Sequence, residues 1–182
     1  MVARKKHSKA LVKKSKTQRK HFQKQINAFS KHNKAKSSDV GINKDKKGRG
    51  RFHAGIFWSK KMEQGFQYRS AYEVAYFHIL EQDDTVESYL VEPFHIPYRW
   101  QNKVKRYFPD IIIWYSDGNK EIIEIKPKNL RFLPQVQAKA RATKEYIKKK
   151  LPGSKYRFVS EEDIFNSPED YRKFLKIIRD HD

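Results

Sequence analysis

Two carboxylates and a lysine lie close together on what the sequence predicts to be a β-hairpin. Asp110 precedes the apolar stretch 111–113, a Ser-Asp-Gly-Asn turn covers 116–119, and Glu124 and Lys126 fall on the returning strand. Side chains of a strand alternate between its faces, so Glu124 and Lys126 should project from the same face. If the hairpin closes in the middle of that turn, opposite residues have numbers that sum to about 234 or 235, which places Asp110 across from Glu124 or one residue away.

Carboxylates placed opposite each other repel, because their Cβ atoms would be only about 4.5 to 5.5 Å apart. A cation must therefore hold them. Mg²⁺ is the natural candidate, since it takes carboxylate oxygens, keeps several waters and is completed by substrate phosphates. The residues alone leave a plainer alternative open, in which Asp110 makes a turn hydrogen bond while Glu124 and Lys126 form a solvated, salt-bridged sheet face.

The elements around the hairpin can be read from periodicity and capping signals. Ser70 followed by Glu73 forms a capping-box signature, and apolar residues then recur with helical spacing. Pro93 and Pro97 favour an edge or interrupted strand. No internal repeat is evident. The expected elements are a helix from Ser70, strands at 86–90 and 94–100, the hairpin, a helix at 134–150, a strand at 156–160 and short helices at 161–165 and 168–179.

The net charge of +20 over 182 residues is very uneven. Residues 1–52 contain 18 Lys or Arg against only Asp39 and Asp45, which gives +16, whereas residues 53–182 carry +4. Such a block of like charge is expected to be a flexible arm whose partner is a polyanion. We therefore predict a basic nucleic-acid-binding arm at 1–52 and a folded domain at 53–182.

The arm has plainer alternatives: a solubilising tail, a localisation signal or an RNA-binding arm of the ribosomal-protein type. Arg49 and Arg51 could enter a DNA minor groove, although the same glycine-flanked segment also suits a linker. The arm alone does not distinguish DNA from RNA.

Cysteine is absent, which excludes disulfides and thiolate zinc sites. No apolar run approaches the length of a membrane span, and the basic N-terminus lacks the apolar region of a signal peptide. We expect a cytoplasmic protein, in the host cytoplasm if a phage encodes it, with no secretion and no membrane partner.

Four segments in order resemble the PD-(D/E)XK nucleases, which have the restriction-endonuclease-like fold. They are residues 68–73, 106–110, 123–128 and 155–162, and the resemblance covers about 66–165. The residues of these segments are similar first to those of the head completion nucleases of tailed bacteriophages, and second to those of transposon-end nucleases. The resemblance implies an α/β domain with a mixed, mostly antiparallel sheet flanked by helices, following a basic N-terminal extension.

The resemblance also implies roles for individual residues. Asp110, Glu124 and the backbone carbonyl of Ile125 would bind Mg²⁺, with Mn²⁺ as a substitute, and Lys126 would orient the attacking water. Glu73 would join the catalytic set and could reach the metal, although its role as a helix cap also explains it. Candidate DNA contacts are Arg49, Arg51, Arg69, Lys128, Arg131 and Lys139.

The sequence therefore favours a Mg²⁺-dependent DNA endonuclease acting on double-stranded DNA, in phage head completion or in a homing or transposon-end setting. A homodimer and phage head or terminase components are partners that the resemblance suggests. A non-catalytic nucleic-acid-binding protein on the same fold and an RNA-binding structural protein remain alternatives. Glycoside hydrolysis fits poorly, because the basic charge favours polyanionic substrates.

Overall fold

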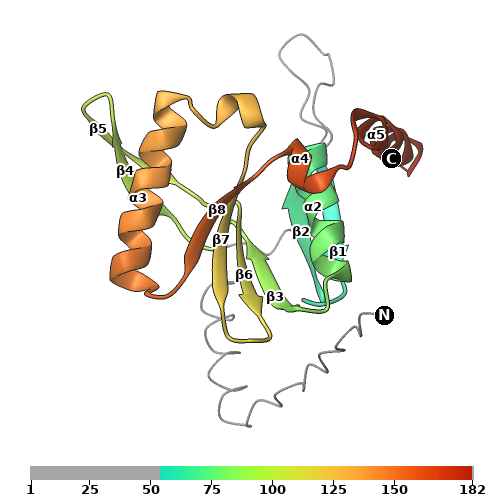
Figure 1. Ribbon diagram of the computed structural model, residues 1–182, viewed down its shortest axis with the longest axis horizontal. Helices are drawn as coiled ribbons and strands as arrows, with labels where there is room; N and C mark the ends of the chain where they lie inside the picture. The colour runs from blue at the N-terminus through green and yellow to red at the C-terminus, as the bar shows by residue number, and fades with distance from the viewer. Residues whose placement is uncertain (1–53, 182) are drawn as a thin grey trace, which may run out of the picture.

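The computed structural model describes residues 54–181 and is built around one mixed sheet with helices on either side (Figure 1). The sheet has the strand order β3-β6-β7-β8: β3 is Val86–Val91, β6 is Ile111–Tyr115, β7 is Lys120–Ile125 and β8 is Lys155–Val159. The first three are antiparallel neighbours, and β8 runs parallel to β7. This arrangement confirms the predicted α/β class. The predicted arm at 1–52 and its boundary with the domain lie outside the described residues.

The β6–β7 hairpin forms as the sequence predicts. Ile111 lies opposite Ile123 and Ile112 opposite Ile122, so Asp110 comes directly before the first paired residue and Glu124 directly after the last. The turn closes at Gly118, whose φ of 89° favours glycine. All three isoleucines of β6 are fully buried because helices and loops cover both faces of the sheet.

Helix α2 (Ala71–Gln82) begins where the capping box predicts. The Ser70 hydroxyl accepts a hydrogen bond from the Glu73 N–H at 3.2 Å, which fixes the first turn. The helix buries Val74, Phe77 and Leu80 in the main core against the sheet.

A hairpin that the sequence analysis did not predict, β1 (Gly55–Ser59) and β2 (Gln64–Tyr68), packs beside α2. Glu81 of α2 holds it in place, because its carboxylate accepts hydrogen bonds from the Ser59 hydroxyl at 2.7 Å and from the N–H groups of Lys60 and Lys61. The Tyr89 hydroxyl of β3 also donates to this carboxylate at 2.9 Å. Glu81 therefore ties the hairpin, the helix and the sheet together.

Two further strands form a separate two-stranded ribbon: β4 (Ile96–Trp100) and β5 (Lys103–Tyr107). Pro97 lies on β4, as the prediction of an edge strand requires. Strand β5 was not predicted, because four of its five residues are exposed and three are basic, which hides any hydrophobic alternation.

The remaining helices follow the predicted order. α3 (Pro134–Lys150) buries Val136, Ala140, Thr143 and Ile147, as its periodicity predicts. A short 3-10 helix, η2 (Lys128–Leu130), precedes it, and α4 (Glu161–Ile164) and α5 (Pro168–His181) complete the chain. Within residues 54–181, no helix combines the length and the apolar character needed to cross a membrane.

Candidate active site

Hydrogen bonds from β7 and from the residue that follows β3 hold Asp110 directly before the start of β6. Its Oδ2 accepts a hydrogen bond from the Ile125 N–H of β7 at 2.5 Å. Its carbonyl oxygen accepts one from the Glu92 N–H, just after β3, at 2.9 Å. The side chain therefore lies where β6 and β7 meet, as the predicted register requires.

Glu124 is the most deeply buried carboxylate of the described residues, with only 2% of its side chain exposed. The Tyr107 hydroxyl, at the end of β5, donates to its Oε2 at 2.8 Å. The Lys126 Nζ lies 3.7 Å from its Oε1, so these two side chains share one face. A buried charge is tolerated only when it is paired and hydrogen-bonded, and Glu124 has both kinds of partner.

The surroundings of Asp110 and Glu124 raise the pKa of both carboxyl groups. Burial, followed by the negative charges of Glu124 and Glu73, raises the pKa of Asp110 well above its ordinary value, against the opposing Ile125 N–H and Lys126. Burial also raises the pKa of Glu124, although Lys126, the Tyr107 hydroxyl and Lys139 oppose that rise. A divalent cation here would relieve the repulsion and favour both ionised forms.

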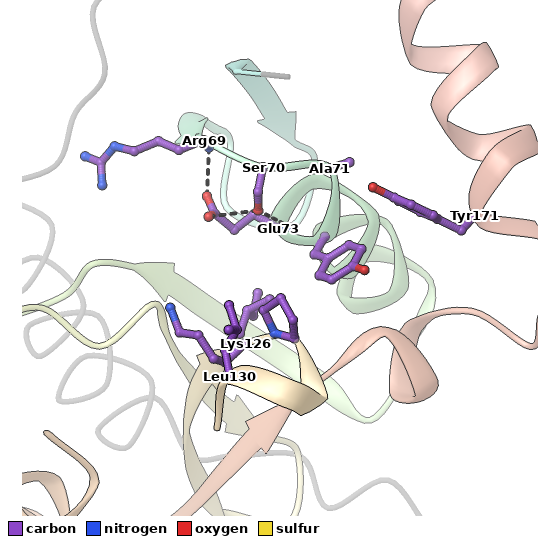
Figure 2. A pocket seen from close by; sticks show the side chains of 10 residues that line it. Arg69, Ser70, Ala71, Glu73, Lys126, Leu130 and Tyr171 are labelled. Atoms are coloured by element: carbon purple, nitrogen blue, oxygen red, sulfur yellow. Dashed lines mark hydrogen bonds between the residues drawn. The ribbon is translucent and has the colours of Figure 1, made fainter. Parts of the chain in front are cut away.

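Glu73 faces the same region from α2. Its carboxylate accepts hydrogen bonds from the Arg69 N–H at 2.8 Å and the Ser70 hydroxyl at 3.0 Å, and burial raises its pKa. Glu73 and Asp110 line one small cavity of about 30 Å³, which has room for one water or one bare ion. A larger groove of about 420 Å³ shares Arg69 and Glu73 with this cavity, and Glu73 and Lys126 lie on its facing walls (Figure 2).

These residues fit a divalent metal by the chemistry of their donors. Asp110 and Glu124 offer hard carboxylate oxygens, and each has one oxygen held by a protein donor, which orients the group. Ile125, whose carbonyl is the predicted third ligand, lines the groove beside Lys126. Within residues 54–181, no three His, Cys, Asp or Glu side chains gather closely enough to form a metal site by themselves. Water and substrate oxygens would have to complete the coordination.

The predicted DNA contacts have partners within the protein. Arg69 forms a two-pronged ion pair with Glu92, and Lys128 donates to Glu162 at 2.7 Å. Arg131 lies 3.7 Å from an Asp163 carboxylate oxygen. Their roles in DNA binding stay predictions, as do those of the catalytic set. Arg49 and Arg51 lie outside the described residues.

Lys139 of α3 lies over the Tyr107 ring, with its Nζ 5.0 Å from the ring centre. The Thr143 hydroxyl lies 3.4 Å from the Tyr107 hydroxyl. Tyr107 therefore holds the Glu124 carboxylate by a hydrogen bond, while Lys139 and Thr143 of α3 contact Tyr107. The sequence analysis did not assign this role to Tyr107.

The comparison with protein families matches residues 83–161 to a family described as TnsA-like endonuclease N terminal. The matched stretch contains Asp110, Glu124 and Lys126, whereas Glu73 lies before it. This match confirms the resemblance to restriction-endonuclease-like nucleases and supports a DNA endonuclease of the transposon-end type. No curated protein matches the chain.

Proposed function

We propose that this protein is a divalent-metal-dependent DNA endonuclease. It would hydrolyse phosphodiester bonds at the open end of the β6–β7 hairpin, where β6 begins and β7 ends. The observation that carries the proposal is the meeting of Asp110 and Glu124 at that end, with the Lys126 ammonium 3.7 Å from Glu124. A purely structural sheet face has no reason to bring the buried carboxylate of Glu124 and the half-buried, repelling carboxylate of Asp110 together beside a groove. The family match of residues 83–161 supports the same activity.

Asp110, Glu124 and the Ile125 carbonyl would hold Mg²⁺, or Mn²⁺ in its place. When bound, the metal supplies a more acidic water and polarises the scissile phosphate. The protein's own groups prepare the site for it. The Ile125 N–H orients Asp110, and the Tyr107 hydroxyl orients Glu124.

Lys126 would act on the substrate. Its ammonium, on the wall of the 420 Å³ groove, is placed to position the attacking water and to stabilise negative charge that develops on the phosphoryl oxygens. Lys126 would orient the water through its N–H donors rather than remove its proton. Glu73, on the facing wall, would limit where water and phosphate can lie.

The charge distribution supports a nucleic acid as the substrate, and the family match favours DNA. The arm at 1–52 would add salt-dependent, sequence-independent affinity, because each phosphate that it neutralises releases counterions. The matched family favours a transposon-end setting. Phage head completion, phage head or terminase partners, a homodimer and a cytoplasmic location stay predictions.

A plasmid-cleavage assay tests this function. The full chain should convert supercoiled plasmid to nicked or linear forms with Mg²⁺ or Mn²⁺, and excess chelator should stop it. Asp110→Asn and Glu124→Gln should each reduce cleavage at least about 100-fold while DNA affinity stays within a few-fold. Asp84→Asn, which changes an exposed carboxylate near the start of β3, is the matched control and should cut normally.

Two results would contradict the proposal. Cutting that persists in excess chelator would refute the metal dependence. DNA binding by the wild-type chain without cutting under any divalent metal would favour a non-catalytic binding protein on this fold.

A further inference from the structure

The β4–β5 ribbon has two faces of different character. Directly opposite residues lie on the same face, so Ile96 with Tyr107 and Tyr98 with Lys105 form one face. Pro97 with Arg106 and Arg99 with Val104 form the other. The ribbon lies against α3, at the edge of the molecule away from α5 (Figure 1).

The inner face anchors the ribbon. Ile96, Tyr98 and Tyr107 are buried in a small core with Ala138 of α3. The Tyr98 hydroxyl accepts a hydrogen bond from the Gln135 Nε2 at 2.7 Å. The tip turns through Gln101 and Asn102, both with positive φ, which is the geometry of a tight two-residue hairpin. The ribbon is therefore held as a fixed projection.

The outer face presents cations that the described protein leaves without carboxylate partners. Arg99 and Arg106 are exposed and form no ion pair with any described residue. Arg141 of α3 is likewise unpaired, whereas Arg69, Arg131, Arg157 and Arg172 each form an ion pair. Val104 lies between them on this face and is 70% exposed. Lys103 and Lys105 project to the opposite face of the ribbon, but both are exposed and add positive charge along β5.

We propose that the β4–β5 ribbon docks in the major groove of duplex DNA, with Arg99 and Arg106 contacting the bases and phosphates there. This inference rests on the proposed function and adds the surface that grips the substrate. The major groove admits a two-stranded β-ribbon, whereas the minor groove is about half as wide. The forked guanidinium suits guanine edges and phosphates, and an exposed valine suits a thymine methyl group.

The ribbon is also connected directly to the candidate active site. Arg106 immediately precedes Tyr107, whose hydroxyl holds Glu124, and Asp110 follows three residues later. Lys139, on the helix that supports the ribbon, contacts the Tyr107 ring. The strand that carries Arg106 therefore continues directly into the segment that carries Tyr107 and Asp110.

The test combines charge removal with a DNA whose major groove is blocked. Binding of the full chain is measured on duplex DNA and on the same duplex carrying glucosylated hydroxymethylcytosine, whose sugar fills the major groove. The variant is Arg99→Gln with Arg106→Gln. The matched control is Lys149→Gln with Lys155→Gln, which removes the same charge from two exposed residues at the ends of α3 and β8 away from Asp110. Cleavage by the wild-type chain is recorded separately.

We expect the arginine variant to lose at least about tenfold in affinity for plain DNA and to reduce the slope of log affinity against log salt by about 2. The lysine control should lose less than about threefold. Glucosylation should lower the DNA affinity of the wild-type chain by a similar factor of about ten. It should lower the affinity of the arginine variant hardly further, because both changes remove the same interaction. Unchanged melting temperatures exclude misfolding.

The inference is overturned if the arginine variant binds like the lysine control, or if glucosylation weakens the variant as much as the wild-type chain. Failure of the proposed function would look different, because the wild-type chain would then bind DNA without cutting it.

Discussion

Replacing Tyr107 with phenylalanine tests how the protein prepares Glu124. The change removes one hydroxyl, which donates to the Glu124 Oε2 at 2.8 Å and lies 3.4 Å from the Thr143 hydroxyl. The ring stays in the same small core, beside Ile96 and Ala138, so packing should change little. The experiment therefore isolates one hydrogen bond to a buried carboxylate.

The expected size of the effect on Mg²⁺ affinity follows from what that hydrogen bond does. A hydrogen bond to a charged group is worth about 1.5 to 3 kcal/mol, and groups that orient a metal ligand typically account for about 10- to 100-fold in metal affinity or activity. The Tyr107 hydroxyl also lowers the pKa of Glu124, against the larger effect of burial, which raises it. Without the hydroxyl, Glu124 holds its proton more strongly and competes less well for Mg²⁺.

We therefore expect Tyr107→Phe to need about 10 to 100 times more Mg²⁺ for half-maximal cleavage. At saturating Mg²⁺, its cleavage rate should approach that of the wild-type chain, because the hydroxyl acts through Glu124 and not on the substrate. The assay is a Mg²⁺ titration of plasmid nicking at fixed pH.

Tyr146→Phe is the matched control, since it removes a hydroxyl from a half-buried α3 tyrosine that stacks on Phe94. It should leave the Mg²⁺ dependence unchanged. The reasoning is refuted if Tyr107→Phe shows the wild-type Mg²⁺ dependence, or if its rate stays low at every Mg²⁺ concentration.

Three further predictions concern other parts of the molecule. Lys126→Met should slow cleavage about 100- to 1,000-fold while DNA affinity stays within a few-fold, and a rate within threefold of the wild-type rate would remove Lys126 from the chemistry. Glu81→Gln should lower the free energy of unfolding at pH 7 by about 1 to 3 kcal/mol, measured by urea denaturation. Burial raises the pKa of Glu81, but the hydrogen bonds from Ser59, Tyr89, Lys61 and Lys60 outweigh it and hold the pKa below its ordinary value. The stability that ionised Glu81 provides is therefore present above its unfolded-state pKa and is lost as pH falls through the lower folded-state pKa. If the difference in unfolding free energy between Glu81→Gln and the wild-type chain stays constant into strong acid, ionisation of Glu81 is not involved. Deleting residues 1–48 should flatten the salt dependence of DNA binding by about 0.9 in slope for each phosphate that the arm neutralises, without lowering the melting temperature, and an unchanged slope would remove the arm from the interface.

Local signals were enough to predict the parts of the fold nearest the carboxylates. The Asp-Gly turn and its spacing to Asp110 and Glu124 fixed the hairpin register, while the unbroken isoleucines of β6 indicated a strand that is buried on both faces. The capping box placed the start of α2 correctly. The residues that determine these elements lie within a few positions of one another in the sequence.

The parts that were missed depend on contacts between distant segments. Strand β5 is a run of cations around Val104 that pairs only because β4 lies beside it on α3. The β1–β2 hairpin is held by Glu81, which lies more than ten residues further along the chain. Tyr107 could not be recognised as the donor to Glu124, because that hydrogen bond spans 17 residues and requires the ribbon to be in place.

The proposed function requires Asp110 and Glu124 to bind one divalent ion jointly. A crystal of the full chain grown or soaked with Mn²⁺, examined by anomalous scattering, tests it most directly. We expect a manganese peak in contact with carboxylate oxygens of both residues, and no such peak in an Asp110→Asn crystal. A manganese ion bound elsewhere, with these two carboxylates contacting only protein groups, would contradict it.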